Sequence, residues 1–237
     1  MLVLLLSLSA QAEVPELDAI IERARPLRAK RKGANPPPIP PETYAKAQSG
    51  QTVTSLDKVE GVDRKVAWGV TVVPYPIQQV WSAVNDFSDR TDYSKVEFSE
   101  VQQGEHCGSG RQVFQYLPIG FPVSDRWWVT TLRINEDLAQ ASGGSVRELY
   151  FRASTEPEKL KTEAAREKAE SGVPVGFSEG AWLLIAAGDD HTIVEYHASS
   201  DPGGSVPTSF ANAFATGGVK STLEAVIKLA GADPRCP

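Results

Sequence analysis

The sequence predicts an α+β protein in which a curved antiparallel β-sheet wraps around a long C-terminal α-helix. Strand-like segments between residues 96 and 155 follow one another through short turns, which is typical of an antiparallel meander and not of alternating strands and helices. Apolar residues recur at helical spacing from Thr208 to Ala230. Because such a sheet cannot bury its concave face alone, we expect this helix to cover it.

The bulk composition indicates a folded globular protein. The chain has 237 residues, of which 41% are hydrophobic and 23% are charged. Its net charge of −6 argues against nucleic acid as a partner, because phosphate binding needs a basic face. Residues 23–32 carry six Lys or Arg, which we interpret as a solvated basic helix end; contact with anionic lipid stays open.

The first residues have the pattern of a signal peptide. Residues 1–12 contain an apolar run that ends in Ala10-Gln11-Ala12, the small-x-small pattern of a cleavage site, and this run is too short to span a bilayer. We therefore expect an exported protein, periplasmic or secreted, with the cytoplasm as the alternative.

The chain is expected to divide into four segments. Residues 1–12 form the signal peptide, and residues 13–41 form a charged helix, which Pro26 should kink or end, followed by a Pro-rich linker. The main domain covers residues 42–231, and residues 232–237 are a tail. The domain boundary is placed in the linker because Pro-rich segments favour an extended, solvated backbone.

The elements of the main domain follow from periodicity and from Pro and Gly positions. Helices are expected over 42–49, 76–87, briefly after Ser88, over 156–171 and over 208–230; strands are expected over 51–59, 64–73, 96–103, 111–117, 124–135, 145–155, 179–187 and 191–200. Residues 135–144 are expected to be a loop. Gly217-Gly218 should loosen or kink the last helix.

Two cysteines, Cys107 and Cys236, allow one disulfide or two free thiols, and the sequence leaves both possibilities open. The histidines do not have metal-ligand spacing, so no metal site is expected; neither is a cofactor, since phosphate-loop and dinucleotide motifs are missing from the sequence.

Three segments resemble a known family. They are Phe121-Pro-Val-Ser-Asp-Arg-Trp-Trp128, then Gly180-Ala-Trp-Leu-Leu184 paired with Thr192-Ile-Val-Glu-Tyr196, and Asp201-Pro-Gly-Gly-Ser-Val-Pro207 with Asn212 beyond it. Their order over residues 42–231 resembles the START lipid-transfer domains, of bacterial type, within the birch-pollen-allergen-like and polyketide cyclase superfamily. The resemblance implies the helix-grip fold with an internal hydrophobic cavity gated by the C-terminal helix.

The resemblance implies that the protein binds and transfers a hydrophobic ligand, a lipid, without catalysing a reaction. Alternation places Arg126, Trp128, Thr130 and Leu132 on one strand face. Leu132 falls where some sterol-binding relatives carry an interior Arg, so an apolar or a differently anchored ligand is expected. The candidate ligand-binding residues are Phe114, Tyr116, Arg126, Trp128, Thr130, Leu132, Tyr196, Phe210 and Phe214, each with plain core packing as the alternative.

Other interpretations remain for the same residues. Asp125 and Arg126 suit either a head-group site or a structural tie to a neighbouring loop. Glu195 and His197 share a strand face and would serve a polyketide cyclase or aromatase type of enzyme as acid and base, with Arg126, or else be buried, partnered polar groups. A third interpretation is an interaction module with a filled core. We expect a monomer with transient membrane contact.

Overall fold

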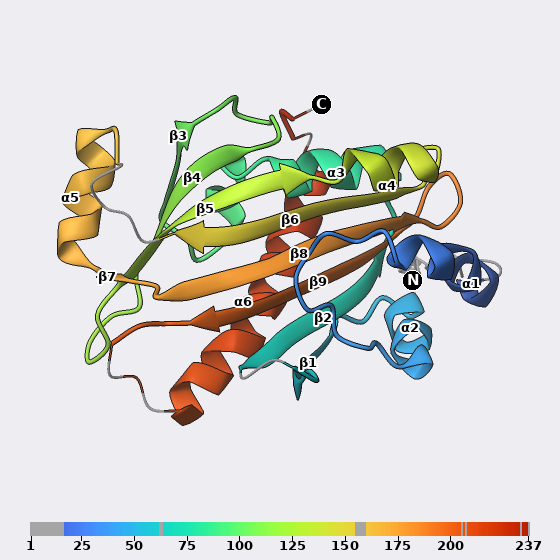
Figure 1. The fold of residues 1–237 in the computed structure, drawn as a ribbon, viewed down its shortest axis with the longest axis horizontal. Helices are drawn as coiled ribbons and strands as arrows, with labels where there is room; N and C mark the ends of the chain where they lie inside the picture. The colour runs from blue at the N-terminus through green and yellow to red at the C-terminus, as the bar shows by residue number, and fades with distance from the viewer. Residues whose placement is uncertain are drawn as a thin grey trace, which may run out of the picture.

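The computed structural model describes residues 17–61, 64–154, 160–204, 206, 208–232 and 234–236, and in this part nine strands form one sheet (Figure 1). The strands are β1 Val53–Lys58, β2 Lys65–Val73, β3 Phe98–Gln103, β4 Arg111–Leu117, β5 Arg126–Ile134, β6 Val146–Ser154, β7 Val173–Pro174, β8 Phe177–Ala186 and β9 Thr192–Asp201. Their order is β1-β2-β9-β8-β6-β5-β4-β3, all antiparallel, and β7 pairs with β5 in parallel. The predicted α+β class is confirmed.

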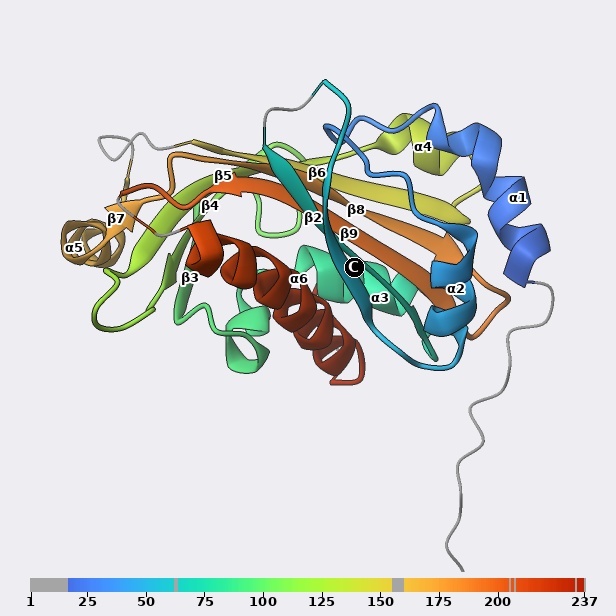
Figure 2. The same cartoon turned by 90° about the horizontal axis from the view of Figure 1, so that it is seen from below.

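The helices lie on both sides of this sheet. They are α1 Leu17–Arg28, α2 Pro41–Gln48, α3 Ile77–Asn85, the 3-10 helix η1 Asp89–Tyr93, α4 Glu136–Ala141, α5 Glu163–Ser171 and α6 Thr208–Ala230. The concave side holds α6 together with α3 (Figure 2). The long C-terminal helix therefore covers the face for which the sequence predicts it.

The C-terminal half of α6 packs firmly against the sheet. Val219, Leu223, Val226 and Leu229 are almost fully buried in the core that α3 and the concave face share. Gly69 on β2 permits this close approach, because a Cβ at that position would lie 2.6 Å from Leu223 Cδ1. A side chain there would push the helix away from the sheet.

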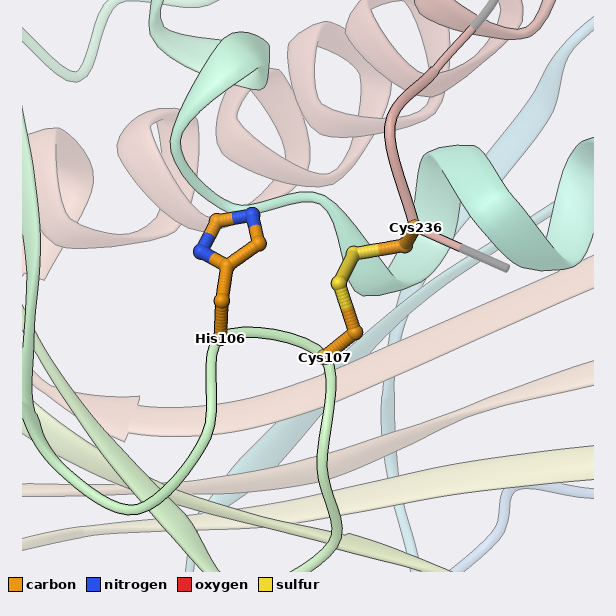
Figure 3. Close-up of side chains that lie close together, drawn as sticks. All are labelled: His106, Cys107 and Cys236. Atoms are coloured by element: carbon orange, nitrogen blue, oxygen red, sulfur yellow. A yellow bond between two sulfur atoms is a disulfide. The ribbon is translucent and has the colours of Figure 1, made fainter.

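The end of α6 and the tail after it are fastened to α3, to η1 and to the β3–β4 loop. Cys236 and Cys107 form a disulfide across 129 positions, so the first of the two possibilities for the cysteines is the one realised (Figure 3). Gln79 Nε2 donates to the Ala230 carbonyl at 2.6 Å, and Arg235 pairs with Asp89. The C-terminal end of α6 is thus held covalently and by hydrogen bonds.

The convex face is covered by the N-terminal part of the chain. Leu17, Ile20 and Ala24 of α1 share a buried cluster with Tyr44 of α2 and with side chains of β2, β8 and β9. Pro26 lies inside α1, which ends two residues later at Arg28. The residues assigned to a separate helix and linker therefore pack on the sheet of the main domain.

Two elements differ from those that the sequence predicts. Residues 136–141 form α4 in place of the expected loop, because the Asn135 side chain caps the helix by accepting from Leu138 N at 3.2 Å and Leu138 is buried. The helix expected over 156–171 is shorter, since α5 begins at Glu163 with Thr162 as its cap. Residues 155–159 and the predicted signal peptide lie outside the described residues.

In the described part of the chain, no helix combines the length and the apolar character that crossing a membrane requires.

Candidate functional site

A cavity of about 740 Å³ lies between the concave face of the sheet and α6. Its volume falls in the upper part of the ~300–1,000 Å³ range of sites that hold one small molecule. The walls are mostly apolar, and their aromatic part is a stack on neighbouring strands. Trp182 and Tyr196 have ring centroids 4.3 Å apart, and Phe151 stacks on Tyr196 at 6.2 Å.

Five predicted ligand-binding residues line this cavity. They are Arg126, Trp128, Thr130, Tyr196 and Phe214. Trp128 Nε1 donates to Gln115 Oε1 at 3.0 Å, so the indole is tied to the neighbouring strand β4. Burial raises the pKa of Tyr196 to about 12, against the opposing charge of Arg90, so its hydroxyl is a neutral donor at physiological pH.

Three of the other predicted residues have different positions. Phe114 and Tyr116, expected in the cavity, lie on the convex face, in a cluster with Trp127, Val129 and the helix α5. Neighbouring Gln115 and Leu117 line the cavity instead, because alternate residues of β4 point to opposite faces. Leu132 has the inward orientation but lies beyond the cavity, fully buried in the core.

Phe210 lies in the first turn of α6, and its side chain falls outside the described residues.

Arg126 fills a structural position at the cavity wall. Its guanidinium donates to the carbonyls of Pro202 at 2.6 Å and Gly203 at 3.1 Å, and also to Ser124. The first two carbonyls belong to the turn that precedes α6. Arg126 therefore ties the start of β5 to the base of the C-terminal helix, and its donors are already occupied.

Arg90, which is not among the residues predicted from the sequence, is the cation of greatest interest in this cavity. It lies in η1 and is 5% exposed, with its guanidinium 3.8 Å above the Phe87 ring and 5.7 Å from the Trp182 ring. Among the described residues, its Nη2 is buried without a hydrogen-bond partner. Burial lowers the pKa of Arg90 to about 10, which still leaves it charged at physiological pH.

An unpaired buried guanidinium is costly unless a ligand supplies acceptor oxygens. Arg90 lines the cavity, so an acceptor group of a bound molecule would reach it there. No sequence motif marks this residue: it stands in a short 3-10 turn without periodicity, and only the arrangement of η1 against the sheet reveals it.

Glu195 and His197 lie on the opposite face of the sheet from the cavity. They alternate with Tyr196, whose ring points inward, and their partners come from the N-terminal segment. We name residues 28–35, which cross the convex face, the N-terminal strap. Arg28 Nη1 donates to Glu195 Oε2 at 2.8 Å, and Tyr44 donates to Glu195 Oε1 at 2.8 Å.

The strap also donates hydrogen bonds to Glu148, the second buried carboxylate on this face. The backbone N–H of Lys32 donates to Glu148 Oε2 at 2.7 Å, and Arg31 Nε donates to Glu148 Oε1 at 3.2 Å. Burial by itself would raise the pKa of Glu195. The hydrogen bond and charge of Arg28, together with Arg31 and Tyr44, outweigh burial and hold this pKa below its usual value. Arg28 and Arg31 are thus ion-pair partners of the sheet, which corrects their interpretation as part of a solvated basic helix end.

His197 is neutral in this setting. Burial, with the nearby charge of Arg31, lowers its pKa to about 4. Its Nε2 donates to the Ala34 carbonyl at 2.8 Å, and its Nδ1 faces Arg31 Nη2, which can only donate. The acid–base pair considered for an enzyme is therefore a buried, partnered structural network.

His106, Cys107 and Cys236 offer potential ligand atoms within 4.8 Å of one another (Figure 3). Both sulfurs are bonded to each other in the disulfide, so neither cysteine provides the thiolate that a metal ion would need.

The strand order and the helix that closes the concave face are shared with solved structures of other proteins. The fold is that of the START lipid-transfer domains. Human StAR-related lipid transfer protein 5 has a TM-score of 0.62 at 14% identity, covering 91% of this chain and 94% of the human one. A STAR-related lipid transfer protein from Xanthomonas axonopodis has a TM-score of 0.59 at 18% identity, covering 76% and 98%. The predicted helix-grip START fold is confirmed.

A third structure, the lipid transfer and protein localization domain of human StarD13, has a TM-score of 0.57 at 14% identity and covers 79% of this chain and 93% of its own. No protein-family model and no curated protein sequence matches the chain. The likeness to the START structures therefore rests on three-dimensional arrangement.

Proposed function

We propose that the protein binds one lipid-like molecule in the concave cavity and carries it without transforming it. The observation that supports this most is the pairing of a mostly apolar cavity of about 740 Å³ with Arg90, whose buried Nη2 has no hydrogen-bond partner in the described part of the chain. Apolar walls supply affinity at roughly 25 cal/mol per Å² of buried surface, and a single polar anchor orients the ligand.

The proposed ligand is amphipathic. Its hydrocarbon part contacts Trp128, Phe151 and Trp182, and an acceptor oxygen contacts Arg90. The START structures of similar fold, named as lipid transfer proteins, support a hydrophobic ligand of this kind. The enzyme alternative is less supported because Glu195 and His197, its proposed acid and base, contact the N-terminal strap instead of the cavity.

The proposed gate is the N-terminal half of α6. Its described side chains from Ala211 to Thr216 are half-exposed, whereas the half after Gly218 is packed in the core. Gly217 and Gly218 line the cavity and separate the two halves. Glycine lowers helix stability, so a bend at this pair would open the cavity while the anchored half stays in place.

Native mass spectrometry of the purified protein, followed by lipid extraction, tests this proposal. A co-purifying lipid of one molecule per chain is expected. Arg90→Gln should reduce the occupancy, whereas Arg152→Gln is the matched control because that side chain is 73% exposed. Ligand-free protein that also fails to bind added fatty acid or phospholipid would contradict the proposal.

We also propose export, from the pattern of residues 1–12, with the Cys107–Cys236 disulfide as support because disulfides persist in oxidising compartments. N-terminal sequencing of the secreted or periplasmic protein should begin at Glu13. Retention of the whole chain in the cytoplasm would contradict this.

A further inference from the structure

The β3–β4 loop and the tail after α6 bring a histidine beside the disulfide (Figure 3). His106 and Cys107 are neighbours in the loop, and Cys236 lies in the tail. One potential ligand atom from each of the three residues lies within 4.8 Å of the other two. Because the residues stand at positions 106, 107 and 236, no local spacing in the sequence marks them as a group. Two sulfurs and one imidazole nitrogen form a donor set that suits Zn²⁺.

The imidazole of His106 is available as a ligand. Its Nε2 is buried and makes no hydrogen bond with the described residues, although Asp86 Oδ1 lies 3.4 Å away. Its Nδ1 faces Ser88 Oγ at 3.5 Å, which is the outer limit of a hydrogen bond. A buried polar atom without a partner costs free energy, so a cation that binds the ring nitrogen would relieve that cost.

The charges around the three residues suit a divalent cation. Asp86, beside His106, is fully buried, and so is Arg111, whose charge interacts with it. Arg111 Nη1 donates at 2.7 Å to the carbonyl of Gly108, the residue after Cys107. The opposite charges of Asp86 and Arg111 offset each other. Two cysteine thiolates would then be left to neutralise a cation of charge +2.

We propose that the reduced protein binds one Zn²⁺ ion through His106, Cys107 and Cys236, and that the metal replaces the disulfide as the link between the β3–β4 loop and the tail after α6. The fourth coordination position is left to water. The Cα atoms of the two cysteines are 5.6 Å apart. Two Zn–S bonds of about 2.3 Å place the sulfurs roughly 3.8 Å from each other, so the backbone needs little adjustment.

Exchange of the disulfide for the metal needs a dithiol as reductant. One of its thiolates attacks the sulfur of Cys107, the partly exposed cysteine, and Cys236, which is 2% exposed, leaves as a thiolate. The second thiol attacks the mixed disulfide and releases Cys107. The dithiol thus loses two electrons and becomes a disulfide, and the protein disulfide gains them. Zn²⁺ binds the two protein thiolates, and the two protons that the dithiol brought pass to solvent.

Titration of the reduced protein with Co²⁺ tests the site, because thiolate-bound Co²⁺ absorbs light whereas Zn²⁺ does not. The full chain is reduced with dithiothreitol, which is then removed under nitrogen. One Co²⁺ per chain is expected, with thiolate-to-cobalt charge-transfer absorption and the visible bands of tetrahedral cobalt. Zn²⁺ should displace the Co²⁺ and abolish both signals, and the oxidised protein should show neither.

Histidine variants separate this site from metal capture by the thiols alone. His106→Ala should weaken Co²⁺ binding by at least about tenfold, since loss of even an outer-shell partner costs roughly 10–100-fold. His191→Ala is the matched control, because His191 lies in the β8–β9 turn and contacts Asp190. Equal affinity of His106→Ala and the wild type, one Co²⁺ for every two chains, or equal binding by the oxidised protein would each overturn the proposal.

Urea unfolding shows whether the metal restores the link. Zn²⁺ should raise the urea midpoint of the reduced wild type, because a ligand of the native state stabilises it, and should raise that of His106→Ala much less. If reduction alone unfolds the chain, Zn²⁺ is expected to restore the helical circular dichroism. A midpoint and a helical signal that Zn²⁺ leaves unchanged would also overturn the proposal. Lipid occupancy enters none of these measurements, so their outcome is independent of the proposed function.

Discussion

Arg28 and Glu195, 167 positions apart, form an ion pair that joins the N-terminal strap to the central strand β9. Glu195 is 2% exposed, and Arg28 also donates to the Tyr44 hydroxyl at 2.8 Å. The strap thus supplies the counter-charge that makes a buried carboxylate tolerable on the sheet.

Arg28→Met should lower the free energy of unfolding by about 3 kcal/mol, because it leaves Glu195 buried with fewer partners. Urea unfolding measures this. Arg25→Met is the control, since Arg25 pairs with Glu22 on the surface and such pairs contribute less than about 1 kcal/mol. The double variant Arg28→Met/Glu195→Gln should recover part of the loss; a fully additive loss would show that the two residues are not coupled.

Stability should fall as the pH drops from 6.5 to about 4. In this range the unfolded chain protonates His197 and the folded protein does not, because its pKa is lowered to about 4. Proton binding to the unfolded state then costs up to roughly 3 kcal/mol of folded stability, and above pH 6.5 this contribution is constant. Urea unfolding at pH 7 and pH 5 measures the slope.

His197→Gln should flatten that slope between pH 6.5 and 4.5. The lowered pKa of Glu195 acts only below its ordinary value of 4.5, where protonation of the unfolded chain removes stability. The two groups are therefore separable by pH. An unchanged slope in the variant would assign the effect to other groups.

Trp127 and Trp128 provide a matched pair on one strand. Trp128 lines the cavity, whereas Trp127 packs on the convex face beside Phe114 at a centroid distance of 5.9 Å. Trp128→Ala should reduce lipid occupancy, and Trp127→Ala should lower unfolding free energy by about 3–5 kcal/mol with occupancy retained in the folded fraction. Native mass spectrometry and urea unfolding check both. Equal loss of occupancy in the two variants would argue against a ligand on the concave side.

Stiffening α6 should slow ligand exchange. A Cβ at Gly217 or Gly218 meets nothing within 4 Å, so alanine fits at both positions. Each change should favour the helix by about 1 kcal/mol and so hinder bending. Transfer of a fluorescent lipid should slow in Gly217→Ala/Gly218→Ala and stay unchanged in Lys228→Ala, an exposed position of the anchored half. Unchanged transfer in the double variant would remove the hinge from the gating proposal.

Loss of the disulfide should destabilise the protein. Cys107→Ser/Cys236→Ser opens a link across 129 positions and should lower the free energy of unfolding by about 2–5 kcal/mol. Hydrogen exchange of residues 219–230 should increase more than that of β8. A mass that shows two free thiols in the native protein would contradict the pairing.

The strands and α6 were predictable because their apolar residues recur with the period of each element, as along Val219, Leu223 and Val226. The sequence did not predict which face of a strand points into the cavity. On β4 the aromatic Phe114 and Tyr116 suggest a cavity wall, but α5 covers them on the other side. Alternation along a strand predicts which residues share a face. Which of the two faces lines the cavity depends on how the helices pack against the sheet.

The most important polar residues of both faces were hidden for another reason. Arg90 stands in a short 3-10 turn, and the partners of Arg28 and Arg31 come from strands more than a hundred positions away. A cluster of basic residues before a Pro-rich segment has the appearance of a solvated helix end. Its role depends on long-range contacts that no local pattern encodes.

The N-terminal strap has a practical consequence for anyone who shortens this protein for expression. A truncation at the Pro-rich segment, keeping residues 42–231, would strip Glu148 and Glu195 of the cations and backbone donors that now neutralise them. It would also remove Cys236 and leave Cys107 as an unpaired thiol. A piece that keeps these partners and the buried side chains of α1 therefore begins no later than Leu17 and extends through Cys236.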